Sequence, residues 1–329
     1  MMLFISRKFI LIFAILGVVI AIGVYLSANN YYNNRSVLTG DKIIIINQGS
    51  NLNSISRQLV EDNIIDYPEI FVKLSQFFHK KPIVKAGEYK IVAGATPNDI
   101  ITMLMEGKYH MRSVTFPEGF TNTQIIERLN NIEYLFGEIS TTYQEGVLLP
   151  DTYNYTYGQQ REDILKVMHQ RMQSVLEDAW NNRQDDLPLD NINEALILAS
   201  IVEKEAAIID EKQVVASVFI NRLRKNMRLQ TDPTVIYAIT KGRHKLDRLL
   251  TKADLRIDSP FNTYMVKGLP PTPIANPGKH AILAVLNPID TNYFYFVATG
   301  NGGHYFSENL AQHNRYVAKY RKLQKSRNN

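Results

Sequence analysis

The first strong pattern along the chain is an unbroken apolar run near its start. Residues 9–27 contain no charged side chain, and Arg7 and Lys8 stand directly before them. Such a run is long enough to cross a hydrocarbon core of roughly 30 Å as a helix. Because positive residues flank the cytoplasmic end of such helices, we expect a cytoplasmic N-terminus, residues 9–27 within the cytoplasmic membrane, and a chain that lies on the far side of that membrane after residue 28. A cleaved signal peptide is the alternative, but the run exceeds the usual apolar core of about 7–15 residues and favours a retained anchor.

Short apolar patterns follow a polar tether at residues 29–40 and alternate between strand and helix periods. They predict strands at residues 42–46 and 87–92, with two helices between them. A further helix is predicted at residues 96–105. This order predicts a compact α+β domain over residues 41–109, which resembles the LysM fold. The resemblance implies docking to glycans that contain N-acetylglucosamine, and a spacer or interaction domain is the alternative of equal weight.

Longer helical periods and proline-punctuated loops mark residues 110–329. Apolar positions at helical spacing predict helices at residues 161–180, 191–205 and 211–224. An aromatic run before an Asn-Gly pair predicts a β-hairpin over residues 293–306. We therefore expect an α+β protein with a single N-terminal transmembrane helix, a small LysM-like α+β domain and a mixed α+β catalytic domain.

Two carboxylates near the end of the helix at residues 191–205 are the strongest candidates for chemistry. Glu203 and Glu205 point to nearly opposite sides, because successive helical residues are rotated by roughly 100°. Glu205 continues a bulky apolar stripe three, four and seven positions behind it, whereas Glu203 follows smaller and more polar side chains. A carboxyl held against apolar side chains is desolvated, which raises its pKa and suits it to donating a proton. Glu205 is therefore the predicted general acid, and a solvated helix end is the alternative from these residues alone.

Composition narrows the classes of function. The net charge of +5 and the pI of about 9.1 suit an anionic polymer or membrane surface. The charge is dispersed and no nucleic-acid motif is present, so we expect no nucleic-acid partner, and the basic tail at residues 310–325 is predicted to be a solvated helix. The absence of cysteine excludes disulfides and a thiolate nucleophile. The scattered histidines include no HExxH pair, so we expect neither a metal site nor a cofactor.

Seven ordered segments carry a resemblance that covers essentially the whole chain. They are EGVLLPDTY (145–153), ASIVEKEA (199–206), ASVFINRL (216–223), LQTDPTVIYA (229–238), FNTY (261–264), GLPPTPIANPG (268–278) and YFYFVATGNGGHYF (293–306). Together they resemble the endolytic murein transglycosylases, the MltG or YceG-like family. The resemblance implies cleavage of the β-1,4 bond between N-acetylmuramic acid and N-acetylglucosamine within peptidoglycan glycan strands, which leaves 1,6-anhydro-muramyl ends. It places the family's catalytic glutamate at Glu205, and it implies contact with peptidoglycan synthases (penicillin-binding proteins), of which the residues themselves give no sign.

Polar residues of the ordered segments are assigned to the substrate groove, with a structural role as the alternative for each. They are Glu203, Gln230, Asp232, Asn262, Tyr264 and His304. A lytic transglycosylase can work with one carboxylate, because the attacking hydroxyl belongs to the substrate itself.

Two other functions stay open from the sequence. A peptidoglycan hydrolase (muramidase) would need a second carboxylate, for which Glu203, Asp232 and Glu145 are candidates. A non-catalytic glycan-binding scaffold of the cell-wall synthesis machinery would not need Glu205 at all.

Overall fold

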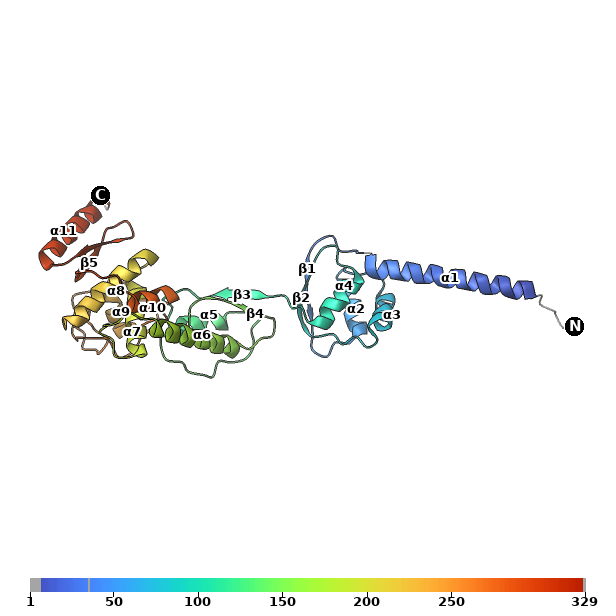
Figure 1. Cartoon of the computed structure of the whole chain (residues 1–329), viewed down its shortest axis with the longest axis horizontal. Coiled ribbons are helices and arrows are strands. Elements are labelled where there is room, and N and C mark those ends of the chain that lie inside the picture. The colour runs from blue at the N-terminus through green and yellow to red at the C-terminus, as the bar shows by residue number, and fades with distance from the viewer. Residues whose placement is uncertain (1–6, 35, 328–329) are drawn as a thin grey trace. The chain divides into compact units, whose positions relative to one another are not determined.

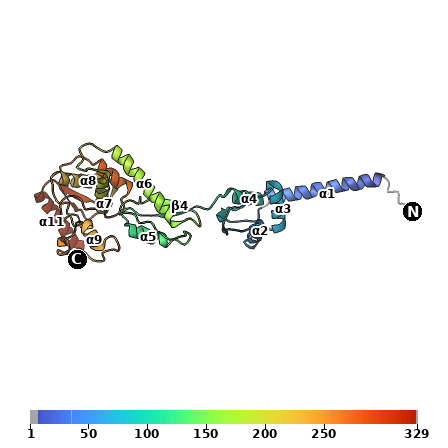
Figure 2. The ribbon, with the colours of Figure 1, turned by 90° about the horizontal axis from the view of Figure 1, so that it is seen from below.

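The computed structural model describes residues 7–34 and 36–327. Figures 1 and 2 show its helices and strands, which fall into two compact units. The N-terminal unit comprises the described residues up to Arg112 together with residues 156–158, and the C-terminal unit comprises residues 113–155 and those from 159 onward. Each unit contains its own hydrophobic core.

The N-terminal unit is built on two antiparallel strands with two helices between them in the sequence. Its elements are α1 (Arg7–Asn34), β1 (Lys42–Ile46), α2 (Leu52–Glu61), α3 (Pro68–His79), β2 (Gly87–Ile91) and α4 (Pro97–Glu106). In the β1–β2 pair, Lys42 lies opposite Ile91 and Ile46 lies opposite Gly87. The predicted order of a strand, two helices, a strand and a helix is confirmed element by element.

Helix α1 extends beyond the predicted transmembrane segment. Its residues 9–26 are exposed, and the described helix from Phe9 to Asn34 is long and apolar enough to cross a membrane. The structure differs from the predicted tether at residues 29–40, because the helix continues to Asn34 and buries two tyrosines. The Tyr32 hydroxyl donates to Ser75 Oγ at 3.2 Å, and its ring stacks on Phe78 with the centroids 5.2 Å apart. The last turn of α1 is therefore part of the core of the N-terminal unit.

The C-terminal unit contains the remaining elements, except that Arg112, the first residue of their first strand, belongs to the N-terminal unit. They are β3 (Arg112–Thr115), α5 (Asn122–Asn130), β4 (Thr152–Tyr155), α6 (Arg161–Asn181), α7 (Ile192–Glu205), α8 (Ile209–Arg224), α9 (Asp232–Thr240), the short 3-10 helix η1 (Asp254–Arg256), α10 (Lys279–Leu286), β5 (Tyr295–Ala298), β6 (His304–Ser307) and α11 (Leu310–Arg327). Strand β3 pairs with β4, and β5 pairs with β6.

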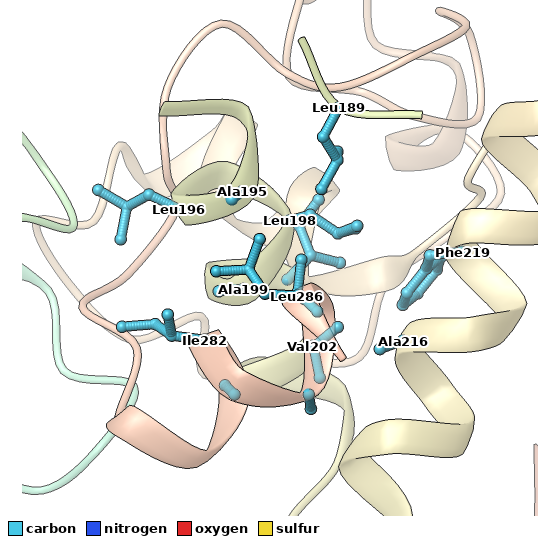
Figure 3. Packing of buried hydrophobic residues seen from close by; sticks show 14 of the residues in the cluster. Leu189, Ala195, Leu196, Leu198, Ala199, Val202, Ala216, Phe219, Ile282 and Leu286 are labelled. Atoms are coloured by element: carbon cyan, nitrogen blue, oxygen red, sulfur yellow. The ribbon is translucent and has the colours of Figure 1, made fainter. Parts of the chain in front are cut away.

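Helix α7 forms the centre of the larger core in this unit. Every residue from Ala195 to Val202 is buried, against α6, α8, α9 and α10. Figure 3 shows Leu198, Ala199 and Val202 of α7 among Phe219 of α8 and Leu286 of α10. A helix that is apolar on all sides belongs in a protein interior. The smaller face predicted to be more polar is thus also buried.

The C-terminal segment forms a hairpin and a helix that pack together. In the β5–β6 pair, Tyr295 lies opposite Ser307 and Ala298 opposite His304, which confirms the predicted hairpin. Helix α11 packs on both strands, and the rings of Tyr305 and Tyr316 stack with their centroids 4.8 Å apart. The basic tail is helical as predicted, but one face of it is packed instead of solvated.

Candidate active site

Helix α7 ends at Glu205 and places this carboxyl at the edge of the apolar core. At its start, Asn191 caps the helix by accepting a hydrogen bond from Glu194 N at 3.1 Å. At its end, the backbone of Ala206 is extended and its N–H donates to Val202 O at 2.9 Å. The chain therefore leaves the helix directly after Glu205, and the fixed core behind it determines where the carboxyl lies.

Glu205 is partly buried and accepts a hydrogen bond from a threonine of a neighbouring loop. The donor is Thr231 Oγ1, which bonds to Glu205 Oε1. Thr231 is itself held in place, because its N–H donates to Thr263 Oγ1 at 3.1 Å. Burial raises the pKa of the Glu205 carboxyl above its ordinary value, and the charge of Asp232 acts in the same direction, while the Thr231 hydrogen bond opposes both. Burial outweighs this hydrogen bond and favours the protonated form that a general acid needs.

An open cleft of about 620 Å³ lies beside Glu205. Its lining comes from the end of α7, from α8, from residues 229, 230 and 232, from Tyr264, and from β5 and α11. Three of the predicted groove residues line it, namely Gln230, Asp232 and Tyr264. The tertiary structure thus brings together, around one carboxyl, segments that are more than one hundred residues apart in the sequence.

Asp232 and Tyr264 form a pair in the cleft. The Tyr264 hydroxyl donates to Asp232 Oδ1 at 2.7 Å. Burial raises the pKa of the Tyr264 phenol, and the Asp232 carboxylate raises it further, so the phenol stays a donor. Thr231 occupies the N-cap position of α9, so Asp232 does not cap the helix. Gln230 is held in the left-handed region with φ of 49°, and its N–H donates to Thr263 O at 3.1 Å.

Asn262 and His304 lie outside the lining of the cleft and bond to the protein itself. Asn262 is fully buried, and its Nδ2 donates to Leu255 O at 3.1 Å and to Ile257 O at 2.9 Å. His304 lies in β6, where its Nδ1 is 2.7 Å from Glu211 Oε2 and its backbone N–H donates to Glu211 Oε1 at 2.9 Å. The first residue fixes the loop that carries Tyr264, and the second fixes the hairpin.

Glu203 occupies a different environment from Glu205, although only Lys204 separates them. Its side chain is 6% exposed and lies 2.6 Å from the ammonium of Lys212, which is 2% exposed. The other oxygen of Glu203 accepts the N–H of Gly278 at 3.0 Å, at the start of α10. Glu203 therefore joins α7, α8 and α10, and it does not line the cleft.

Glu145, the third candidate for a second carboxylate, is partly buried outside the lining of the cleft. Its Oε1 accepts Asn122 N at 2.8 Å and Asn276 Nδ2 at 3.3 Å, and burial raises its pKa. Asp232 is thus the candidate that lies with Glu205 in the cleft. Within residues 7–34 and 36–327, no group of three or more histidine, aspartate or glutamate side chains could hold a metal ion.

Four cleft residues with polar side chains were missing from the sequence prediction: Arg222, Tyr295, His313 and Arg321. Arg222 is 7% exposed, and its guanidinium donates to Phe294 O at 2.7 Å and to Leu229 O at 2.6 Å. A signal for it was present, because Arg222 continues the buried apolar stripe of α8. His313 and Arg321 had no such signal, since they follow no motif and lie in a basic tail.

The sequence matches one protein family along most of its length. A family model described as YceG-like matches residues 44–319. The chain belongs to the YceG-like family. The resemblance drawn from seven segments is thereby confirmed.

Relatives of this YceG-like protein carry the name endolytic murein transglycosylase. It is 33% identical over 309 residues to the endolytic murein transglycosylase of Bacillus subtilis, and the match covers 84% of each chain. It is 26% identical to the endolytic murein transglycosylase of Streptococcus pneumoniae, over 90% of this chain but only 63% of that longer protein. A crystal structure of a YceG-like protein of Listeria monocytogenes is 31% identical, with a TM-score of 0.52 over 84% of this chain and 98% of that one.

Proposed function

We propose that this protein is an endolytic peptidoglycan lytic transglycosylase in which Glu205 is the general acid and base. The observation that carries the proposal is a partly buried carboxyl of raised pKa, bonded to a neutral hydroxyl, at an open polar cleft. The names of the Bacillus and Streptococcus relatives support the same substrate class and reaction. The bond cleaved is the β-1,4 bond from N-acetylmuramic acid to N-acetylglucosamine within a glycan strand.

The reaction needs one carboxyl and no water. The protonated Glu205 transfers its proton to the glycosidic oxygen as the bond from the muramic acid C1 to that oxygen breaks. The resulting carboxylate then takes the proton of the muramic acid C6 hydroxyl, whose oxygen attacks C1 and closes the 1,6-anhydro ring. Because this attack is intramolecular, the activation free energy includes no entropic cost for positioning a second reactant. Glu205 ends the cycle protonated, as it began.

The residues around Glu205 have separate roles in this proposal. Gln230, Asp232 and Tyr264 contact the sugar hydroxyl and acetamido groups, because they line the cleft and carry polar side chains. Thr231 orients the carboxyl. Asn262 and Glu203 act on the site through the loop and the helix that they hold, and His304 acts through the hairpin.

A muramidase is the second candidate, and one observation favours it. Asp232 lies in the same cleft as Glu205 and could activate water or attack C1. Against this, its carboxylate already accepts the Tyr264 hydroxyl. The two reactions differ in their products, since hydrolysis leaves reducing ends and transglycosylation leaves 1,6-anhydro ends that are lighter by one water.

Mass spectrometry of the products separates these functions. Full-length protein is incubated with purified glycan strands in parallel with the variants Glu205→Gln and Glu194→Gln, the second being a matched change on the same helix. We expect 1,6-anhydro ends from the wild type and the Glu194 variant, and a loss of at least about 10²-fold for Glu205→Gln. Products with reducing ends would show that the protein is a hydrolase. Strand binding without any cleavage would assign a scaffold, and full activity of Glu205→Gln would reject the proposed acid.

Location and partners follow from the same proposal. Helix α1 anchors the chain in the cytoplasmic membrane with its N-terminus in the cytoplasm, because Arg7 and Lys8 precede the apolar run. The C-terminal unit then acts outside that membrane, where peptidoglycan lies. The strand, helix, helix, strand order of β1, α2, α3 and β2 supports a LysM-like glycan-docking domain. Contact with penicillin-binding proteins is tested by crosslinking the anchored protein in cells.

A further inference from the structure

Helix α3 carries a row of exposed apolar side chains that the proposed reaction does not use. Tyr67, at its N-cap, and Ile70, Phe77 and Phe78 lie on one side of the helix, and we call them the α3 patch. Phe77 is 70% exposed, Tyr67 47%, Ile70 41% and Phe78 40%, whereas Val72, on the opposite side of the helix, is buried. A contiguous apolar surface of this kind marks contact with a partner or with a membrane.

The α3 patch lies beside the helix that leaves the N-terminal unit. A cavity of about 600 Å³ is lined by Ile20, Val24 and Ala28 of α1 together with Tyr67 and Ile70 of the patch. Figures 1 and 2 both show α3 next to the end of α1 that enters this unit. The patch is therefore continuous with the exposed apolar surface of α1.

The position of these contacts along α1 indicates how deep they lie in the bilayer. A hydrocarbon core of roughly 30 Å takes about 20 helical residues, so a span that begins at Phe9 ends near Ala28. Ile20 stands eight residues before Ala28, which is about 12 Å deeper along the helix. Side chains that share a cavity with Ile20 and Val24 must lie at the boundary of the bilayer or just inside it.

The charges around the α3 patch fit the same boundary. Lys73, Lys80 and Lys81 are exposed on α3 and directly after it. Lysine side chains at such a boundary extend their ammonium groups toward phosphate, and tyrosine is enriched at the same level. Anionic lipid headgroups attract clustered lysines. Apolar, aromatic and cationic side chains thus occur together on α3 and directly after it, as expected for a surface at the boundary between lipid and water.

We propose that the α3 patch is a membrane-docking surface of the N-terminal unit. Tyr67, Ile70, Phe77 and Phe78 enter the headgroup and upper acyl region of the leaflet from which α1 emerges, and the lysines contact lipid phosphates. The occupant is the lipid surface, because the patch continues the lipid-facing surface of α1. The inference rests on α1 spanning a membrane and is independent of the reaction at Glu205.

Depth measurement by spin labelling tests this proposal directly. The chain has no cysteine, so one nitroxide can be placed at Phe77→Cys in the full-length protein, in bilayers that contain anionic phospholipid. Met111→Cys is the matched control, because Met111 is 54% exposed and lines a cavity with β2 and α4 residues and none of α1. Val18→Cys, in the apolar run, is the reference for the lipid interior. We expect the Phe77 label to be several-fold more accessible to oxygen, relative to a water-soluble nickel chelate, than the Met111 label.

Three outcomes would overturn the proposal. Equal chelate accessibility at Phe77 and Met111 would place the patch in water. Spin–spin broadening at Phe77 that disappears on dilution with unlabelled chain would show that a second copy covers it. Chelate accessibility at Val18 would show that α1 does not span the bilayer, and it would leave the proposed reaction untouched.

Discussion

Glu203 and Glu205 show how two similar residues acquire different chemistry. Glu203 is paired with the buried ammonium of Lys212, which compensates its charge. Glu205 has a threonine hydroxyl instead, and burial raises its pKa. A paired carboxylate stabilises a fold, whereas a desolvated carboxyl with a neutral partner can give up a proton. Because the two residues are rotated apart on the helix, Glu203 contacts α8 and the start of α10, whereas Glu205 faces the cleft.

The raised pKa of Glu205 predicts how activity and stability depend on pH. As pH rises through the folded-state pKa, Glu205 loses its proton, so kcat falls on the alkaline side. The unfolded chain, with a lower pKa at this residue, binds fewer protons in that window, so stability also falls as pH rises. Glu205→Gln removes the buried charge. At pH values above the folded-state pKa the variant should therefore melt at a higher temperature than the wild type, but it should show no such gain below the unfolded-state pKa of about 4.3. A difference in melting temperature that is the same at every pH would contradict this.

Thr231 should tune the same titration. Its hydrogen bond lowers the pKa of Glu205, so Thr231→Val is expected to move the alkaline limb of the activity profile to higher pH. We also expect kcat to fall by about tenfold, because the carboxyl loses its orientation. The measurement is the pH profile of product formation. Thr240→Val is the control, since Thr240 is a buried threonine at the other end of α9. If the alkaline side of the activity profile does not shift in Thr231→Val, Thr231 does not influence the titration of Glu205.

At the scale of elements, the cleft depends on a helix that carries no motif. Helix α11 packs on β5 and β6 and contributes Leu310, His313, Val317 and Arg321 to the lining. Its ring contact with the hairpin holds it there. Periodicity predicted the helix correctly but could not identify its partner, because packing against a hairpin leaves no distinct pattern in a short basic segment.

Truncation of α11 should therefore weaken substrate binding. A chain that ends at Glu308 loses this wall of the cleft, and we expect KM to rise by about tenfold or more with a smaller change in kcat, because Glu205 is held by α7. A chain that ends at Tyr320 keeps three of the four lining residues and should show an intermediate KM. Steady-state kinetics on glycan strands measures both, and circular dichroism checks folding. Unchanged KM in both truncated chains would show that α11 does not contact substrate.

At the scale of the whole molecule, the two units have separate hydrophobic cores. Tyr89 lies in the core of the N-terminal unit, and Phe219 lies in that of the C-terminal unit. Each unit should therefore unfold as a unit of its own, since burial of apolar area is the main source of stability in either one.

Calorimetry of the full-length protein should accordingly show two transitions. Tyr89→Ala is expected to cost roughly 3–5 kcal/mol in the N-terminal transition, by analogy with other buried aromatic side chains, and to leave cleavage of short soluble glycans unchanged. Phe219→Ala is the matched change and should lower the other transition together with activity. A single transition that both variants lower equally would show that the units unfold together.

The sequence by itself determined several of the elements and the family, and it placed Glu205 at the end of a helix. Apolar periodicity extends over neighbouring residues, so the strands β1 and β2, the hairpin and the helix ending at Glu205 could be predicted from local spacing. The tertiary structure alone decided what each side chain meets. It docked Tyr31 and Tyr32 in a segment predicted to be a tether, buried Asn262 within its own loop, and brought Arg222 and α11 to the cleft. The physical reason is that long-range partners are selected by the packing of whole surfaces, and a one-dimensional pattern shows which face is apolar but not which surface covers it.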